Sequence, residues 1–217
     1  MKIKIAPSIL ASDFSRAGET VKKLELSGAD YVHCDVMDGS FVPPITFGHQ
    51  LVAGIRPHTK LPLDCHLMVM HPETHFEEFQ KAGADIVTVH LEACRNNLKE
   101  NLAKIKALNM KCGAVLNPDT PIEDIFDYVP HCDMILVMSV FPGYGGQKFI
   151  ENTLPRLEAL RSFCIKNGYP DFDIEVDGGI TEQNVKDVIT AGANVIVAGS
   201  TVFKSADMAK TIASLRG

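Results

Sequence analysis

Two histidines and two aspartates stand near the ends of three apolar segments of the chain. His33 and Asp35 lie two residues apart in YVHCDVMDGSFVP, and alternate residues of a strand share one face. His66 lies in LDCHLMV, and Asp177 ends the segment FDIEVD. Imidazole nitrogens and carboxylate oxygens are good ligands for a divalent transition ion. A metal would also offset the high cost of burying an unpaired carboxylate.

Four such side chains at the ends of three predicted strands favour a metal site over a structural hydrogen-bonded pair. Zinc suits two nitrogens and two carboxylates best, and Fe²⁺, Mn²⁺ or Co²⁺ also fit this ligand set. His90 and Glu92 in TVHLEA repeat the two-residue spacing on the next predicted strand. They are either further ligands or partners that orient the ligands, and the spacing alone leaves both roles open.

Eight apolar segments have the length and composition of buried strands, and segments with helical periodicity separate them. The strands are predicted at 2–10, 30–37, 61–69, 85–92, 111–117, 134–140, 172–178 and 194–200. The helices are predicted at 15–26, 47–57 (irregular), 74–82, 97–108, 121–129 (short), 155–167, 182–191 and 206–216. This alternation predicts an α/β fold, a closed (β/α)₈ TIM barrel with residues 1–217 as one domain. An open doubly wound sheet is the alternative, but no GxGxxG follows the first strand.

A short phrase recurs where predicted helices give way to strands. It reads SGADYV around Gly28, AGADIV around Gly83 and AGANVI around Gly192. Glycine adopts the left-handed conformation that ends many helices. We therefore expect a tight helix-to-strand turn at each of the three positions.

Three glycine-rich segments follow the last three predicted strands, namely FPGYGGQKF, DGG and AGS. Glycine lets backbone N–H groups approach an anion closely, and barrel enzymes often hold phosphate beside the last two strands. The sequence therefore predicts a phosphate site, with Ser8 and Ser200 as hydroxyl donors. Lys148 is either a cation for the phosphate or a solvated lysine.

The composition, 46% hydrophobic and 22% charged, is that of an ordinary globular protein. The formal charge of −6 and the lack of basic runs argue against nucleic-acid binding. No apolar run reaches the length of a membrane span. Six cysteines without a recognisable secretory signal predict reduced thiols and a cytoplasmic location.

A metal, two carboxylates and a phosphate site at one barrel mouth suit a reaction of a ketose phosphate. The metal would act as a Lewis acid and stabilise the enediolate left when a carbon-bound proton departs. One of Asp35 and Asp177 would remove that proton, and the other would return a proton to the opposite face. The predicted outcome is inversion of the stereocentre.

Six segments together resemble the ribulose-phosphate 3-epimerase family: APSILASDF, HCDVMDGSFVP, LDCHLMV, PGYGGQKF, EVDGGI and AGSTVF. The resemblance runs along essentially the whole chain. It implies a barrel of the ribulose-phosphate-binding type that interconverts D-ribulose 5-phosphate and D-xylulose 5-phosphate, a step of the pentose phosphate pathway. It also implies a homo-oligomer, either a dimer or a hexamer, whose partner is a small sugar phosphate.

The resemblance also implies roles for individual residues. It makes Asp35 and Asp177 the acid/base pair, and it makes His33, Asp35, His66 and Asp177 the metal ligands. The implied apolar lid over the intermediate consists of Met37, Met68 and Met138. The implied substrate contacts are Ser8, His66, Gly143, Tyr144, Gly145, Gly146, Asp177, Gly178, Gly179, Gly199 and Ser200. His90 and Glu92 are not ligands in the family pattern, which favours their orienting role.

Three loop residues depart from the family pattern: Pro44 replaces an expected Asn, Phe141 a common acidic residue, and Tyr144 a commoner Phe. An epimerase for a related ketose phosphate, such as allulose 6-phosphate, is therefore the alternative function. A barrel decarboxylase of the orotidine or ketogulonate phosphate type would need the lysine of a DxKxxD pattern, which DVMDG lacks. A non-catalytic phosphosugar-binding protein would need no opposed pair of carboxylates.

Overall fold

The computed structural model describes residues 1–217, apart from the side chain of Arg95. Its strands are β1 (Lys4–Ala6), β2 (Val32–Met37), β3 (Leu63–Met68), β4 (Ile86–His90), β5 (Lys111–Leu116), β6 (Met134–Met138), β7 (Asp173–Asp177) and β8 (Val195–Val197). Its α-helices are α1 (Ala17–Leu26), α2 (His49–Ile55), α3 (Phe76–Lys81), α4 (Leu91–Cys94), α5 (Leu98–Ala107), α6 (Thr153–Lys166), α7 (Val185–Thr190), α8 (Ser200–Phe203) and α9 (Met208–Ser214). Its 3₁₀ helices are η1 (Ile9–Ala11), η2 (Phe14–Arg16), η3 (Arg56–His58), η4 (Pro72–Thr74), η5 (Arg95–Asn97) and η6 (Ile122–His131).

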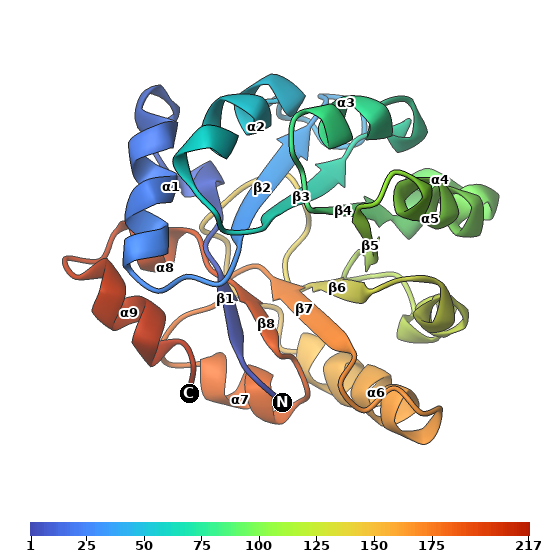
Figure 1. Ribbon diagram of the computed structural model, residues 1–217. Helices are drawn as coiled ribbons and strands as arrows, with labels where there is room; N and C mark the ends of the chain where they lie inside the picture. The colour runs from blue at the N-terminus through green and yellow to red at the C-terminus, as the bar shows by residue number, and fades with distance from the viewer.

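The eight strands form one parallel sheet in the order β1-β8-β7-β6-β5-β4-β3-β2. The two ends of this order also meet, because Ser8 forms a parallel bridge with His33. The His33 N–H donates to the carbonyl of Pro7 at 3.1 Å across the same seam. The sheet therefore closes into the predicted barrel, and the helices surround it (Figure 1).

The strands are buried on both faces, as parallel strands usually are. Residues that point outward join the apolar cluster beneath the helices, and this cluster includes Cys34, Cys65 and Val21 of α1. Residues that point inward, such as Tyr31 and Met134, form separate clusters inside the barrel. All six cysteines of the described chain are free and buried.

The repeated glycines end helices as predicted. The φ angles of Gly28, Gly83 and Gly192 are +86°, +87° and +118°, in the left-handed region that favours glycine. Each turn brings the chain to the start of the next strand within a few residues. The recurring phrase is therefore a local signal for the helix-to-strand turn.

An Asp or Asn that follows each odd-to-even crossover ties the coming strand to the preceding one. Its side chain accepts the backbone N–H of a residue at the start of the preceding odd-numbered strand. The pairs, at 2.8 or 2.9 Å, are Asp30 with Ile5, Asp85 with Leu63, Asp133 with Cys112 and Asn194 with Ile174. The barrel thus consists of four similar quarters of two strands each.

Several predicted segments differ from the structure. The first predicted strand, 2–10, ends at Ala6, and Ile9–Ala11 forms η1. The last predicted strand, 194–200, ends at Val197, and Ser200 begins α8.

Strand β4 ends at His90, so Glu92 lies in the first turn of α4 and not on the strand as predicted. Glutamate is depleted in strands and favoured in the first turn of a helix. The fifth crossover is the 3₁₀ helix η6, which contains Pro130, a residue that cannot donate a helical hydrogen bond.

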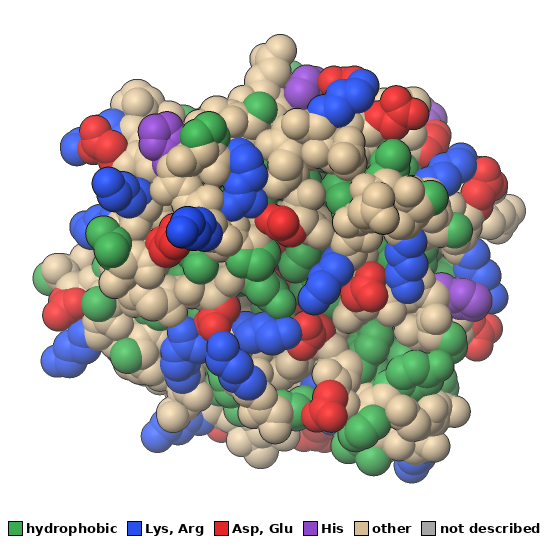
Figure 2. Space-filling model, in the orientation of Figure 1, with side chains coloured by type: hydrophobic (Ala, Val, Ile, Leu, Met, Phe, Trp, Pro, Cys, Tyr) green, Lys and Arg blue, Asp and Glu red, His purple; other side chains and the backbone are tan. Residues whose placement is uncertain are grey.

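Acidic and basic side chains are mixed on the surface. Lys and Arg are interspersed with Asp and Glu over the face drawn in Figure 2. Ion pairs such as that between Arg56 and Asp85 join some of these charges. Among the described residues, no helix has the length and apolar character needed to cross a membrane.

Candidate active site

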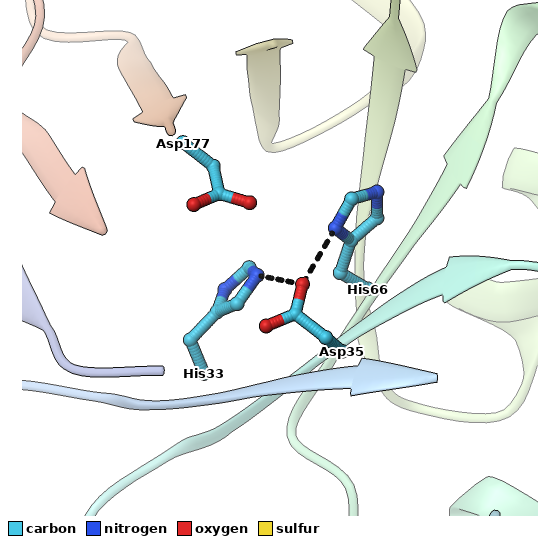
Figure 3. Close-up of side chains that lie close together, drawn as sticks. All are labelled: His33, Asp35, His66 and Asp177. Atoms are coloured by element: carbon cyan, nitrogen blue, oxygen red, sulfur yellow. Dashed lines mark ion pairs between the residues drawn. The ribbon is translucent and has the colours of Figure 1, made fainter. Parts of the chain in front are cut away.

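The four predicted metal ligands lie together inside the barrel, with Asp177 at the carboxyl-terminal end of β7 (Figure 3). His33 and Asp35 come from β2, His66 from β3, and Asp177 from the end of β7. Asp35 Oδ1 lies 3.5 Å from His33 Nε2 and 3.4 Å from His66 Nδ1. One ligand atom from each of the four residues lies within 4.8 Å of the other three. The structure thus brings the whole predicted ligand set together.

Two buried nitrogens of this cluster have no hydrogen-bond partner among the described residues. They are Nε2 of His33 and Nδ1 of His66, the same atoms that face Asp35. An unsatisfied buried polar atom costs about 1–3 kcal/mol. A divalent ion would accept a lone pair from each nitrogen and offset the charge of the carboxylates. The residues therefore fit a metal with two nitrogen and two oxygen ligands.

His33 is oriented by a carboxylate on the far side of its ring. Its Nδ1 lies 2.7 Å from Asp64 Oδ2 and 3.6 Å from Glu175 Oε1, and all three residues are fully buried. In the neutral imidazole, an Nδ1 proton donated to Asp64 leaves the Nε2 lone pair facing the cluster, where a metal could bind it. The sequence reasoning missed Asp64 and Glu175. Each stands two residues before a predicted ligand, His66 or Asp177, and that parity would have found them.

The surroundings of the two aspartates push their pKa values in opposite directions. Burial raises the pKa of Asp35, but the charge of His33, whose Nε2 lies 3.5 Å away, outweighs burial and holds this pKa well below the ordinary value. The Ser8 hydroxyl also donates to Asp35 Oδ2. Burial and the nearby charge of Asp35 raise the pKa of Asp177 to about 7. These opposite shifts favour the ionised form of Asp35 and the protonated form of Asp177.

His90 lies beside the cluster and not in it. Its Nε2 is 2.8 Å from His66 Nε2, and its Nδ1 is 3.1 Å from Glu92 Oε2. Burial raises the pKa of Glu92, but the interaction with His90 and the N–H of Asn117 outweigh burial and lower the pKa to about 2. His90 therefore contacts His66 at Nε2, on the side of the ring opposite the cluster, and Glu92 contacts His90 in turn.

A cavity of about 990 Å³ opens beside the cluster, with Asp35 and Asp177 in its wall. Of the described residues, His66, a predicted substrate contact, is fully buried and is not among those that line this cavity. Pro44 and Phe141, which depart from the family pattern, also line the cavity. So do the other predicted contacts and lid residues: Ser8, Met37, Met68, Met138, Gly143, Tyr144, Gly145, Gly146, Gly178, Gly179, Gly199 and Ser200.

Two of the lining glycines are required by the backbone. Gly178 and Gly179 have φ angles of +121° and +66°. A Cβ on Gly179 would lie 2.4 Å from the backbone nitrogen of Phe149, and a Cβ on Gly178 would lie 2.4 Å from Val140. The end of β7 therefore packs directly against the loop after β6, with backbone groups at the cavity wall.

Comparison with known proteins identifies the family. Residues 4–203 match the ribulose-phosphate 3 epimerase family. The chain belongs to this family. The ribulose-phosphate 3-epimerase of Synechocystis sp. is 52% identical over 216 residues, which cover 99% of this chain and 93% of the relative. That of Bacillus subtilis is 47% identical over 99% of both chains, and the chloroplastic enzyme of Arabidopsis thaliana is 48% identical over 99% of this chain and 76% of its own. The chain is thus an isomerase of the epimerase class.

Solved structures of other enzymes share the barrel of this epimerase-family chain. A mutant tryptophan synthase α-subunit from Pyrococcus furiosus superposes with a TM-score of 0.72 at 16% identity over 99% of both chains. The 3-hexulose-6-phosphate synthase of Salmonella typhimurium gives a TM-score of 0.70 at 19% identity over 99% of this chain and 97% of its own. At such identities the similarity concerns the fold alone.

Proposed function

We propose that the protein interconverts D-ribulose 5-phosphate and D-xylulose 5-phosphate by proton transfer at C3. The observation that carries the proposal is the placement of Asp35 and Asp177, which enter one cavity from β2 and β7 beside the four-residue cluster. The names of the relatives support the choice of substrate.

Asp35 and Asp177 would act on opposite faces of the substrate. Strands β2 and β7 are separated in the closed ring by β1 and β8, so a substrate between them meets one carboxylate on each side. One carboxylate removes the proton from C3, and the other returns a proton to the opposite face, which inverts the configuration. The opposite pKa shifts support these separate roles, because Asp35 is ionised at a pH at which Asp177 can hold a proton.

The ion that we propose for the cluster is Zn²⁺, with Fe²⁺, Mn²⁺ and Co²⁺ as alternatives that the same ligands accept. When bound, it would supply Lewis-acid stabilisation of the negative charge that develops on the substrate oxygens. Met37, Met68 and Met138 line the same cavity and would keep water from the carbon that loses its proton.

The glycine-rich segments after β6, β7 and β8 would hold the phosphate. They bring Gly146, Gly179 and Gly199 to the wall of the same cavity, with Ser200 as a hydroxyl donor. Backbone N–H groups suit a phosphate because they are fixed donors that need no side-chain ordering.

Deuterium incorporation tests the proposal. We would incubate the Zn²⁺-loaded protein with ribulose 5-phosphate in D₂O and follow both pentose phosphates by NMR. We expect xylulose 5-phosphate that carries deuterium at C3, since the returned proton comes from a carboxylate that exchanges with solvent. Asp35→Asn and Asp177→Asn should each lower the rate about 10²–10⁴-fold, the usual effect of a positioned acid or base.

Asp171→Asn is the matched control, because Asp171 is exposed and precedes β7, at the opposite end of that strand from Asp177. It should react at the wild-type rate. Absence of exchange at C3 in the metal-loaded wild type would exclude the pentose as substrate. Exchange into allulose 6-phosphate instead would then establish the alternative epimerase.

A further inference from the structure

A line of three side chains, two of them fully buried, runs from the predicted metal cluster to the first turn of α4. It consists of His66, His90 and Glu92, joined by contacts of 2.8 Å between the two Nε2 atoms and 3.1 Å between His90 Nδ1 and Glu92 Oε2. Both imidazoles are fully buried. The ring of Phe41 packs on His90 with its centroid 4.7 Å away, which limits rotation of that imidazole.

Hydrogen-bond donors hold Glu92 at Oε1, the oxygen that faces away from His90. Its Oε1 accepts the backbone N–H of Asn117 at 2.7 Å and the hydroxyl of Thr120. Arg156 fixes the same turn, because its Nη2 donates to the carbonyls of Asn117 and Thr120 at 2.7 and 3.0 Å. Glu92 therefore stands as an anchored carboxylate whose other oxygen, Oε2, faces His90.

The direction of every hydrogen bond in this line follows from the carboxylate. An ionised carboxylate only accepts, so Nδ1 of His90 carries the proton and donates to Oε2. In a neutral imidazole the other nitrogen is then an acceptor, so His90 Nε2 must receive the proton of His66 Nε2. His66 is left with an unprotonated Nδ1, the atom that lies 3.4 Å from Asp35 Oδ1 in the cluster.

We propose that Glu92 and His90 are positioning residues that set the tautomer of His66, so that its Nδ1 lone pair is available to the metal. The inference rests on the proposed metal site and deepens it. Asp64 orients His33 in the same way, but it contacts the other type of ring nitrogen. It lies 2.7 Å from His33 Nδ1, so Nε2 of His33 is the atom available to the metal. The two histidine ligands thus present different nitrogens because their carboxylate partners reach them differently.

The nearly isosteric change Glu92→Gln should reverse the direction of the hydrogen bonds from residue 92 through His90 to His66. The side-chain carbonyl of Gln must still accept from Asn117 and Thr120, so its NH₂ group faces His90. That group donates to His90 Nδ1, and His90 Nε2 then carries a proton that it donates to His66 Nε2. The proton of His66 moves to Nδ1 and blocks the ligand position.

The first measurement is the tautomer itself, from ¹⁵N shifts of histidine-labelled protein in the metal-free and Zn²⁺-loaded forms. We expect His66 Nδ1 to be unprotonated in the wild type and protonated in metal-free Glu92→Gln. An unprotonated His66 Nδ1 in both proteins would overturn the inference, whatever the metal data show.

The second measurement is metal affinity, from chelator competition for Zn²⁺ and from the visible spectrum of the Co²⁺ form. We expect Glu92→Gln to bind Zn²⁺ about 10–100-fold more weakly, the usual effect of losing such a partner, with altered Co²⁺ bands. Glu77→Gln, an exposed residue on α3, is the matched control and should bind as the wild type does. Equal affinity in Glu92→Gln and Glu77→Gln would refute the positioning role.

Two further results separate this inference from the proposed function. If the wild type binds neither Zn²⁺ nor Co²⁺, the metal site of the proposed function fails, and the positioning role fails with it. If Glu92→Gln does not fold, His90→Phe replaces it, since it keeps a ring of similar size against Phe41 but breaks the line. His90→Phe should also weaken Zn²⁺ binding, and wild-type affinity in this variant would contradict the inference.

Discussion

Asp35 and Asp177 are two carboxylates of one cluster that experience different surroundings. Asp35 shares a strand face with His33, whose charge stabilises the ionised form of the carboxylate. Asp177 sits at the end of β7, where burial and the charge of Asp35 oppose ionisation. Such a separation of pKa values is how one site provides both an acid and a base.

The raised pKa of Asp177 makes the stability of the metal-free protein depend on pH. In the unfolded chain this carboxyl loses its proton near its ordinary pKa of 3.8, whereas the folded chain holds the proton up to about pH 7. Between these values the folded state binds the extra proton, so the free energy of unfolding falls as the pH rises. We expect Asp177→Asn to lose this part of the pH dependence, measured by urea unfolding with chelator present.

The control for Asp177→Asn is a variant that neutralises a carboxylate outside the cluster. Asp171→Asn removes an exposed carboxylate and should keep the wild-type slope of stability against pH. Parallel curves for the wild type and Asp177→Asn would show that Asp177 ionises normally in the folded protein.

At the scale of elements, each quarter of the barrel has a turn side chain that accepts a backbone N–H of the preceding strand, and one quarter differs in the residue that does so. Three quarters have an aspartate at the turn, and the fourth has Asn194. Asn194 Oδ1 accepts from the Ile174 N–H and from Arg161 at 3.0 Å, while its Nδ2 donates to Asp173 Oδ1 at 2.7 Å. Asp173 also pairs with Lys4 of β1. An amide is needed here because a carboxylate would face that of Asp173.

We therefore expect different costs for two substitutions of Asn194. Asn194→Ala leaves the buried Ile174 N–H and one donor of Arg161 without partners, at about 1–3 kcal/mol each, so the free energy of unfolding should fall by about 2–6 kcal/mol. Asn194→Asp keeps the acceptor but repels Asp173, and should cost less than the alanine change. Urea unfolding at neutral pH would measure both.

Asp133→Asn is the control for this pair. Its amide oxygen can still accept the Cys112 N–H in the third quarter, so the stability should change little. A loss in Asp133→Asn as large as that in Asn194→Ala would show that the charge of the turn residue, and not its acceptor atom, stabilises the quarter.

For the whole molecule, the proposed metal site draws on residues from distant parts of the ring. Its ligands come from β2, β3 and β7, and the seam between β1 and β2 lies inside this arc. The unfolded chain cannot bring these ligands together, so an ion that binds them stabilises the folded barrel. Metal binding and closure of the barrel should therefore be linked.

Zinc should raise the melting temperature of the metal-free protein. At a free concentration about 100-fold above the dissociation constant, binding adds about 2.7 kcal/mol. For a chain of this size that corresponds to a shift of about 5–11 °C. Calorimetry with Zn²⁺ and with chelator would measure it. His66→Ala should lose most of the shift, and an equal shift in that variant would place the stabilising zinc elsewhere.

The sequence by itself determined the barrel and the four residues that the structure brings together as a candidate metal site. Strand positions follow from apolar segments, and the period of two along a strand placed His33 and Asp35 on one face. The glycine turns at Gly28, Gly83 and Gly192 depend on local backbone preference, which one short phrase can encode. These features need only neighbours in the chain, and the structure agrees with them.

Only the tertiary structure decided the contacts between strands. The pairing of His33 with Asp64, the pKa of Asp177 and the path from His66 to Glu92 depend on which side chains meet across the barrel and how far they are removed from water. Glu92 itself was misplaced on a strand, because its carboxylate finds its partners at Asn117 and Thr120, far along the chain. Local sequence patterns do not encode contacts between residues that are distant in the chain. The sequence therefore predicted the four residues of the cluster, and the fold decided which nitrogen of each histidine faces it.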